Sequence, residues 1–250
     1  MDKIEKNRIN ENKWDLCDEN SYKKIKTIRQ RGVPLYKAAD VFVGIQTLAD
    51  DVFIMENMGE TKNYISCKLF NKNIIEIEKD ILMPIVKVST MKNGQDVKKR
   101  IILCPYDIKT KDKQVLMKEE TIKTKYPNAY KYLLENKTRL LARDKGRPKT
   151  PWYAYGREIN IAKTLGDKIL TSSMNLNPNF MKSPSKYHSF YSGYAIKIKE
   201  NKITSDELLK QLNSNDMKFY INQTARDYQK GWKSYAKMFI NDFGIVLPKK

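Results

Sequence analysis

The sequence predicts an α+β fold in which strands and helices occupy separate stretches of the chain. Apolar and β-branched residues form short runs between about Tyr36 and Asp107, as is typical of strands. Leucine and tyrosine recur at helical spacing after Pro127, and a capping-box pattern at Thr204 and Glu207 starts another helix. Such segregation favours α+β over a regular alternation of strand and helix.

In the first half of the chain, a helix is expected at 21–30, because the breaker Gly32-Val-Pro34 follows it. Strands are expected next, at 41–45, at 52–55, within 64–77 and at 101–104. Pro105 ends the last of these runs. The first half is therefore expected to be mainly β.

In the second half, Pro127 suits the first turn of a helix, since its missing N–H has no intrahelical partner there. That helix should run to Ala142 and pack on the β-rich region. Another helix is expected at 205–222. The side chains expected in the core are Ile45, Phe53, Ile102, Leu133, Leu134 and Leu141.

Composition restricts the class of protein. The 250 residues include 48 Lys and Arg against 29 Asp and Glu, a formal net charge of +19, which favours polyanionic partners. Three widely spaced cysteines and one histidine argue against a disulfide framework and a zinc site. The charged beginning and the lack of a long apolar stretch predict a cytoplasmic protein with no membrane partner.

Two segments, 143–157 and 226–239, interleave basic and aromatic residues, the latter including Tyr228, Trp232 and Tyr235. Lys and Arg neutralise phosphates, Arg also pairs with a guanine edge, and aromatic rings stack on sugars or bases. The candidate DNA ligands are Thr47, Arg143, Lys145, Arg147, Lys149, Tyr153, Tyr155, Arg157, Arg226, Lys230 and Lys233. The structural alternative is a solvated basic loop whose aromatic residues belong to the core, with Arg157 held in an ion pair.

The sequence offers no catalytic, cofactor-binding or metal-ligating residue. His188 has no neighbouring acid or cysteine that completes a triad or a metal site. Glu-x-Lys triplets of the kind found in metal-dependent nucleases occur at 135–137 and 200–202, but neither has a convincing partner Asp on an adjoining strand. The stretch 177–180, NPNF, is similar to the NPPY-type motif of adenine methyltransferases, but Asn179 replaces a proline and no glycine-rich cofactor turn precedes it, so a turn is expected.

The run at 41–55, VFVGIQTLADDVFIM, resembles the opening of the specificity domain of TaqI-like adenine-specific DNA methyltransferases and related restriction-modification enzymes. Gly44, Ile45, Thr47, Asp50 and Phe53 match that pattern, and Leu48 stands where the family has glycine or serine. Further matches follow in the family's order. They are IEKDI at 77–81 with Pro84, IILCPYD at 101–107, the stretch 126–143, WYAYGR at 152–157, KIL at 168–170 and LLKQLNS at 208–214.

The resemblance implies a DNA target-recognition domain at 34–250, with 1–33 as the linker or arm from a catalytic domain. That catalytic domain would either precede Met1 in the same parent chain or form a separate subunit. Its partners would be double-stranded DNA and an N6-adenine methyltransferase catalytic domain that binds S-adenosylmethionine. The chain itself would be non-catalytic and hold no cofactor. The alternatives are an RNA-binding or protein-interaction domain, or a metal-dependent nuclease.

Overall fold

The computed structural model of the protein describes residues 17–110, 113–146, 151–157, 161–200 and 202–248. They form the α+β fold that the sequence predicts, divided into two compact units. Unit 1 comprises the described residues up to Val43, Asp167–Ser183 and those from Gly193 onward. Unit 2 comprises Gly44–Gly166 and Pro184–Ser192. The single domain expected at 34–250 is thus built as two units.

Unit 1 is centred on an antiparallel sheet with the strand order β12-β10-β14-β2. These strands are β2 (Ala39–Val43), β10 (Ile169–Thr171), β12 (Phe180–Lys182) and β14 (Tyr194–Ile198). Two short antiparallel pairs join β1 (Val33–Pro34) to β16 (Gly244–Ile245) and β11 (Met174–Asn175) to β15 (Lys233–Ser234). The helices are α1 (Glu19–Gln30), α2 (Leu35–Ala38), α9 (Ser205–Leu212), α10 (Asn215–Thr224) and α11 (Lys237–Ile240).

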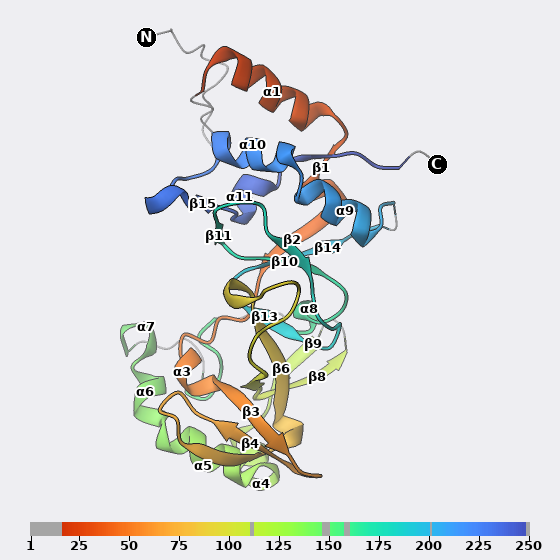
Figure 1. The fold of residues 1–250 in the computed structure, drawn as a ribbon. Helices are drawn as coiled ribbons and strands as arrows, with labels where there is room; N and C mark the ends of the chain where they lie inside the picture. The colour runs from red at the N-terminus through yellow and green to blue at the C-terminus, as the bar shows by residue number, and fades with distance from the viewer. Residues whose placement is uncertain (1–16, 111–112, 147–150, 158–160, 201, 249–250) are drawn as a thin grey trace. The chain divides into compact units, whose positions relative to one another are not determined.

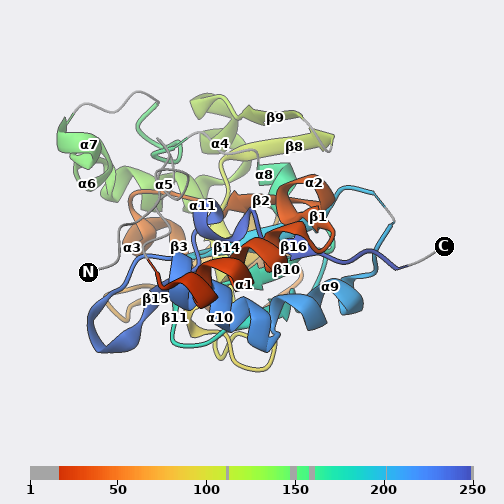
Figure 2. The same ribbon diagram turned by 90° about the horizontal axis from the view of Figure 1, so that it is seen from above.

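The core of unit 1 explains why α1 folds where it does. The Asp18 carboxylate accepts a hydrogen bond from the Ser21 backbone N–H and so caps the helix. Ile25 and Ile28, three residues apart, are buried on one face, and α1 packs beside α10 (Figures 1 and 2). The described part of the expected linker at 1–33 therefore contributes to the core of unit 1.

Unit 2 contains a six-stranded sheet with the order β13-β6-β7-β3-β4-β5, antiparallel except for the pairing of β13 with β6. Its strands are β3 (Ile54–Glu60), β4 (Tyr64–Lys68), β5 (Ile74–Glu78), β6 (Leu82–Lys87), β7 (Arg100–Leu103) and β13 (Ser189–Tyr191). A separate hairpin joins β8 (Tyr106–Thr110) to β9 (Lys113–Leu116). The helices are α3 (Asp50–Phe53), α4 (Glu119–Lys125), α5 (Pro127–Glu135), α6 (Lys137–Leu141), α7 (Arg143–Gly146) and α8 (Ile161–Thr164).

The start of α5 joins the helices of unit 2 to its sheet. Pro127 occupies the first turn, as the sequence predicts. The buried carboxylate of Glu78, at the end of β5, accepts hydrogen bonds from the backbone N–H groups of Asn128 (2.9 Å) and Ala129 (3.0 Å). A carboxylate at a helix N-terminus is stabilised by the free N–H groups and the helix dipole. Glu78 thereby fixes α5 beside β5.

Several expected elements differ in the structure. Val52 and Phe53 belong to the helical turn α3, so the expected strand begins only at Ile54. The helix expected at 127–142 is broken at Asn136, and Leu134 and Leu141 are about half exposed. The core predictions are confirmed for Ile45, Phe53, Ile102 and Leu133, which are buried. Leu140 is buried in place of the two exposed leucines.

The helix expected at 205–222 consists of two helices. The capping box of Thr204 and Glu207 starts α9, as predicted. Ser214 then accepts a hydrogen bond from the Met217 backbone N–H (3.2 Å) and starts α10. The stretch 177–179 has no regular structure and leads into β12, as expected of a turn. Every helix among the described residues is too short or too polar to cross a lipid bilayer.

Candidate nucleic-acid interface

The residues predicted to bind DNA fall into two groups. Thr47 and the segment 143–157 lie in unit 2, whereas Arg226, Lys230 and Lys233 lie in unit 1. The two groups differ in what their side chains contact.

Arg143 is buried in unit 2, and its guanidinium binds backbone carbonyl groups. Nε donates to Leu140 (2.8 Å), Nη1 to Thr47 (3.0 Å) and Ala154 (2.8 Å), and Nη2 to Trp152 (2.7 Å). Burial lowers the pKa of the guanidinium from its ordinary value. These contacts argue against DNA binding by Arg143, because its donors are already occupied inside the fold.

Thr47 is also buried. Its hydroxyl accepts from the Ala49 backbone N–H (3.0 Å) and donates to the Asp50 carboxylate, so the side chain shapes the turn that precedes α3. Leu48 has a φ of 55°, in the left-handed region that favours glycine. The Leu48 side chain packs so closely on Gly156 that a Cβ at position 156 would lie only 2.6 Å from it. Thr47 is therefore better explained as a structural residue than as a DNA ligand.

Tyr153 and Tyr155 belong to the core of unit 2. The Tyr153 hydroxyl donates to the Met117 carbonyl and the Tyr155 hydroxyl to the Leu103 carbonyl, both at 2.9 Å. Tyr155 also packs edge-on against Phe53, with ring centroids 5.1 Å apart. Burial raises the pKa of Tyr155 well above its ordinary value. Neither ring has a free face for DNA, which corrects the expectation for both residues.

Arg157 forms the ion pair that the structural alternative predicts. Its guanidinium donates to both carboxylate oxygens of Asp144, at 3.0 and 3.4 Å. Lys145 is exposed beside this pair, with a φ of 58°. Arg147 and Lys149 lie outside the described residues. In this segment, Lys145 is the described residue whose exposure still suits phosphate binding.

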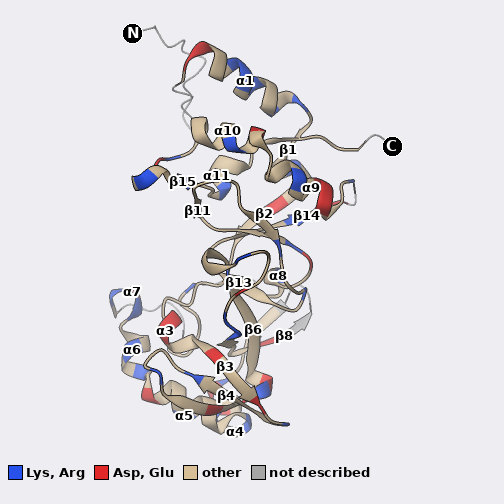
Figure 3. Cartoon of the chain, viewed as in Figure 1, with Lys and Arg blue, Asp and Glu red and all other residues tan. Residues whose placement is uncertain are grey.

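The loop at 225–232 of unit 1, between α10 and β15, presents aromatic and basic side chains to solvent. Lys230 (φ 61°) and Gly231 (φ 78°) make its tight turn, which the Tyr228 N–H closes by donating to the Trp232 carbonyl at 2.8 Å. Figure 3 shows basic residues at this turn, beside β15. Tyr228 and Trp232 keep 42% and 41% of their surfaces exposed. We name this segment the aromatic loop.

A shallow hollow of about 500 Å³ lies on the aromatic loop. Met174, Tyr228, Gln229 and Trp232 line it. Met174 reaches this place because β11 pairs with β15, where Met174 lies opposite Ser234. The hollow therefore combines two exposed aromatic rings, one thioether and one amide.

Two basic residues of the aromatic loop are exposed, and a third, at its end, supports the loop from within. Arg226 and Lys230 are exposed. Lys233 is mostly buried, forms an ion pair with Asp227 and donates to the Asn222 carbonyl at 3.3 Å. These contacts argue against DNA binding by Lys233, because its ammonium group already holds the loop. Arg226 and Lys230 remain the candidate phosphate contacts.

Sequence reasoning found part of this surface. The alternation of basic and aromatic residues identified Tyr228 and Trp232, although Tyr235 of the same segment is buried in unit 1. Met174 and Gln229 were missed. Gln229 carries no signal of its own, and the approach of Met174 depends on a strand pairing between distant parts of the chain.

No model of a known protein family matches the sequence, and no curated protein matches it significantly. Within the described part of the chain, no three His, Cys, Asp or Glu side chains gather as a metal site requires. Of the two nuclease-like triplets, Glu200 forms an ion pair with Lys202, and the other spans the end of α5 and the start of α6.

Proposed function

We propose that this chain is the DNA target-recognition domain of a TaqI-like adenine-specific DNA methyltransferase. It would hold duplex DNA for methylation of adenine N6 by a catalytic domain that binds S-adenosylmethionine. The observation that carries DNA binding is the aromatic loop of unit 1, where Tyr228 and Trp232 are exposed beside Arg226 and Lys230. The order of motifs along the sequence carries the choice of family.

The chemistry of the aromatic loop suits a nucleic acid. Arg226 and Lys230 supply the positive charge that phosphates need, and aromatic faces pack on sugars and bases. Gln229 adds an amide, which has the donor and acceptor that pair with the N7 and N6 of adenine in the major groove.

The motif residues support the family through the fold they build. Glu78 caps α5, Arg143 joins three stretches of unit 2, and Gly44 allows close approach of the Phe190 backbone, whose carbonyl would be 2.3 Å from a Cβ on residue 44. Residues that hold backbone groups in this way tolerate few replacements. They are therefore expected to recur in proteins that share the fold, whereas residues that read bases vary.

The proposal is tested by binding of the purified chain to duplex DNA. Lys230→Gln should weaken binding to all duplexes alike, and Trp232→Ala should cost about 1 to 3 kcal/mol of binding free energy. Lys210→Gln and Tyr36→Ala, on exposed positions of α9 and α2, are matched controls that should bind as the wild type. The chain alone should not bind S-adenosylmethionine in calorimetry.

Three outcomes would contradict the proposal. A duplex affinity that does not change with salt concentration would show that the chain makes no phosphate contacts, since each contact releases counterions. Tighter binding to structured RNA than to duplex DNA would favour the RNA-binding alternative. Stoichiometric binding of S-adenosylmethionine would place the catalytic function in this chain.

A further inference from the structure

The hairpin of β4 and β5 in unit 2 holds an aromatic ring out in solvent. Phe70, in its turn, keeps 83% of its surface exposed. The turn is well ordered by hydrogen bonds: the Leu69 N–H donates to the Asn73 carbonyl (2.8 Å), and the Lys72 N–H donates to the Leu69 carbonyl (3.0 Å). The backbone that carries Phe70 is thus held in place, and its ring has no role in the core.

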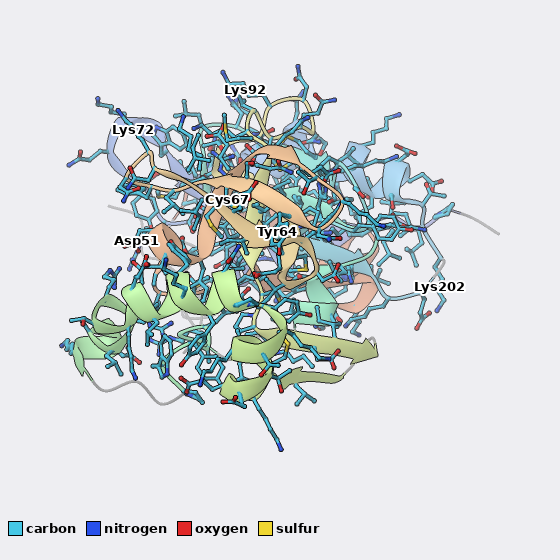
Figure 4. The ribbon with its side chains drawn as sticks, turned by 90° about the horizontal axis from the view of Figure 1, so that it is seen from below. Asp51, Tyr64, Cys67, Lys72, Lys92 and Lys202 are labelled. Carbon is cyan, nitrogen blue, oxygen red and sulfur yellow. The ribbon has the colours of Figure 1, made fainter. Side chains whose placement is uncertain are left out.

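A groove of about 590 Å³ lies beside this hairpin, entirely within unit 2. Phe70 forms part of its wall, together with lysines from three different segments: Lys68 and Lys72 of the hairpin, Lys87 at the end of β6, and Lys98 before β7. In Figure 4, Lys72 lies apart from Cys67, which belongs to β4 in the sheet of unit 2. The exposed turn that carries Phe70 and Lys72 therefore forms one side of the groove.

Two of the three acidic residues that line the groove form ion pairs, and the third, Asp50, accepts a hydrogen bond from the Thr47 hydroxyl. Glu56 accepts from Lys98 at 3.0 Å, and it also lies between Lys68 and Arg100 in the register of β4, β3 and β7. Asp51 pairs with Arg139 through two hydrogen bonds. Arg100 pairs with Asp96.

This pairing leaves a local excess of positive charge. Among the residues that the structure describes, Lys68, Lys72 and Lys87 form no ion pair. These three ammonium groups outnumber the one carboxylate of the groove that is in no ion pair, that of Asp50, so the groove keeps a net positive charge and favours a ligand with several negative charges.

We propose that the hairpin and its groove form a second DNA contact surface. Lys68, Lys72 and Lys87 would bind backbone phosphates, and the Phe70 ring would pack on a deoxyribose. The inference rests on the proposed function, because it takes duplex DNA as the ligand. It concerns other residues than the aromatic loop, so the two surfaces can be tested separately.

Duplex DNA suits this surface better than an apolar peptide does. A peptide would use Phe70 but would leave three ammonium groups to be desolvated without partners, which is unfavourable. A phosphate backbone supplies an anion at every nucleotide, with a sugar between successive anions. An exposed ring flanked by lysines matches that alternation of charge and apolar surface.

The first test compares duplex binding of the full chain and two variants. In the triple variant Lys68→Gln, Lys72→Gln and Lys87→Gln, the negative slope of log K against log salt should become shallower by about 2 to 3, since each lost contact contributes about 0.9. Phe70→Ala should weaken binding about three- to tenfold, without a change in thermal stability. Lys92→Gln and Tyr187→Ala, exposed in unit 2 but outside the groove, should bind as the wild type.

A second test reads the contact directly. When the photo-crosslinking residue p-benzoylphenylalanine replaces Phe70, irradiation with duplex DNA should join the chain to DNA, and the same residue at position 187 should not. Crosslinks to a protein partner but none to DNA would show that the surface serves another ligand.

The failures of the two proposals are distinguishable. If Trp232→Ala weakens duplex binding while the triple variant and Phe70→Ala bind as the wild type, the second surface is wrong and the proposed function stands. If the wild-type chain binds no duplex at all, both are wrong.

Discussion

Arg143 joins backbone carbonyl groups from three separate stretches of unit 2. Its partners lie in α6, in the turn after Ile45 and in the segment that contains Trp152 and Ala154. A buried carbonyl that loses its donor costs about 1 to 3 kcal/mol of stability. A single guanidinium thus stabilises contacts that no short sequence pattern would place together.

Arg143→Met should therefore destabilise unit 2 by about 3 kcal/mol, measured by urea denaturation, since several carbonyls lose their donor. The DNA affinity of the folded fraction should not change. Lys145→Ala, on the neighbouring exposed residue, is the control and should leave the stability within about 0.5 kcal/mol of the wild type. Normal stability with lost DNA binding would instead make Arg143 a DNA ligand.

Lys168, buried in unit 1, gives stability a dependence on pH. Burial, and then the nearby charge of Lys197, lower its pKa from 10.5 to about 8. Between these two values the unfolded chain binds more protons than the folded one, so stability rises as the pH increases from 8 towards 10.5. Below pH 8 the buried ammonium lowers the stability of the folded chain.

Lys168→Met should accordingly be more stable than the wild type at pH 7, by up to about 3 kcal/mol. The difference should shrink when both proteins are unfolded in urea at pH 9.5. Comparing the two proteins at each pH cancels the ionisation of tyrosines, whose ordinary pKa is near 10. A difference that stays constant from pH 7 to 9.5 would show that Lys168 keeps an ordinary pKa.

At the scale of elements, side chains that cap helices decide where they begin and end. The pair Asn213-Ser214 divides the helix expected at 205–222, because Ser214 caps α10 and the Asn213 amide binds both backbone groups of Phe180, each at 2.9 Å. Ser214→Ala should cost about 1 kcal/mol of stability, measured by thermal or urea unfolding. Asn215→Ala, just inside the helix, is the control, and an equal loss there would argue against capping.

The elements that sequence reasoning found are those with a local signal. Pro127, the capping box at Thr204, the alternating run of β4 and the continuous apolar run of β7 each act within a few residues. The break at Asn136 was missed, and it rotates the second turn so that Leu140 faces inward instead of Leu141. Helical spacing alone does not distinguish neighbouring leucines across such a break.

At the scale of the molecule, the division into two units was beyond sequence patterns. The four-stranded sheet of unit 1 unites strands from before, between and after the segments of unit 2. Partner choice in a sheet depends on which apolar faces meet in three dimensions, and the chain order does not encode it directly. The same reason hid the hollow on the aromatic loop, which needs the pairing of β11 with β15.

The net charge of +19 makes it necessary to separate local phosphate contacts from a general electrostatic attraction. If the proposals hold, the phosphate contacts are Lys68, Lys72, Lys87, Arg226 and Lys230. Replacing all five by Gln should make the negative slope of log K against log salt shallower by about 4 to 5.

The control variant removes five positive charges from exposed positions elsewhere, namely Lys26, Lys62, Lys92, Lys131 and Lys210. Both variants have a net charge of about +14, so general attraction would change their slopes equally. Equal slopes would therefore contradict both surfaces, whereas a loss confined to the first variant would assign the contacts to the groove and the aromatic loop.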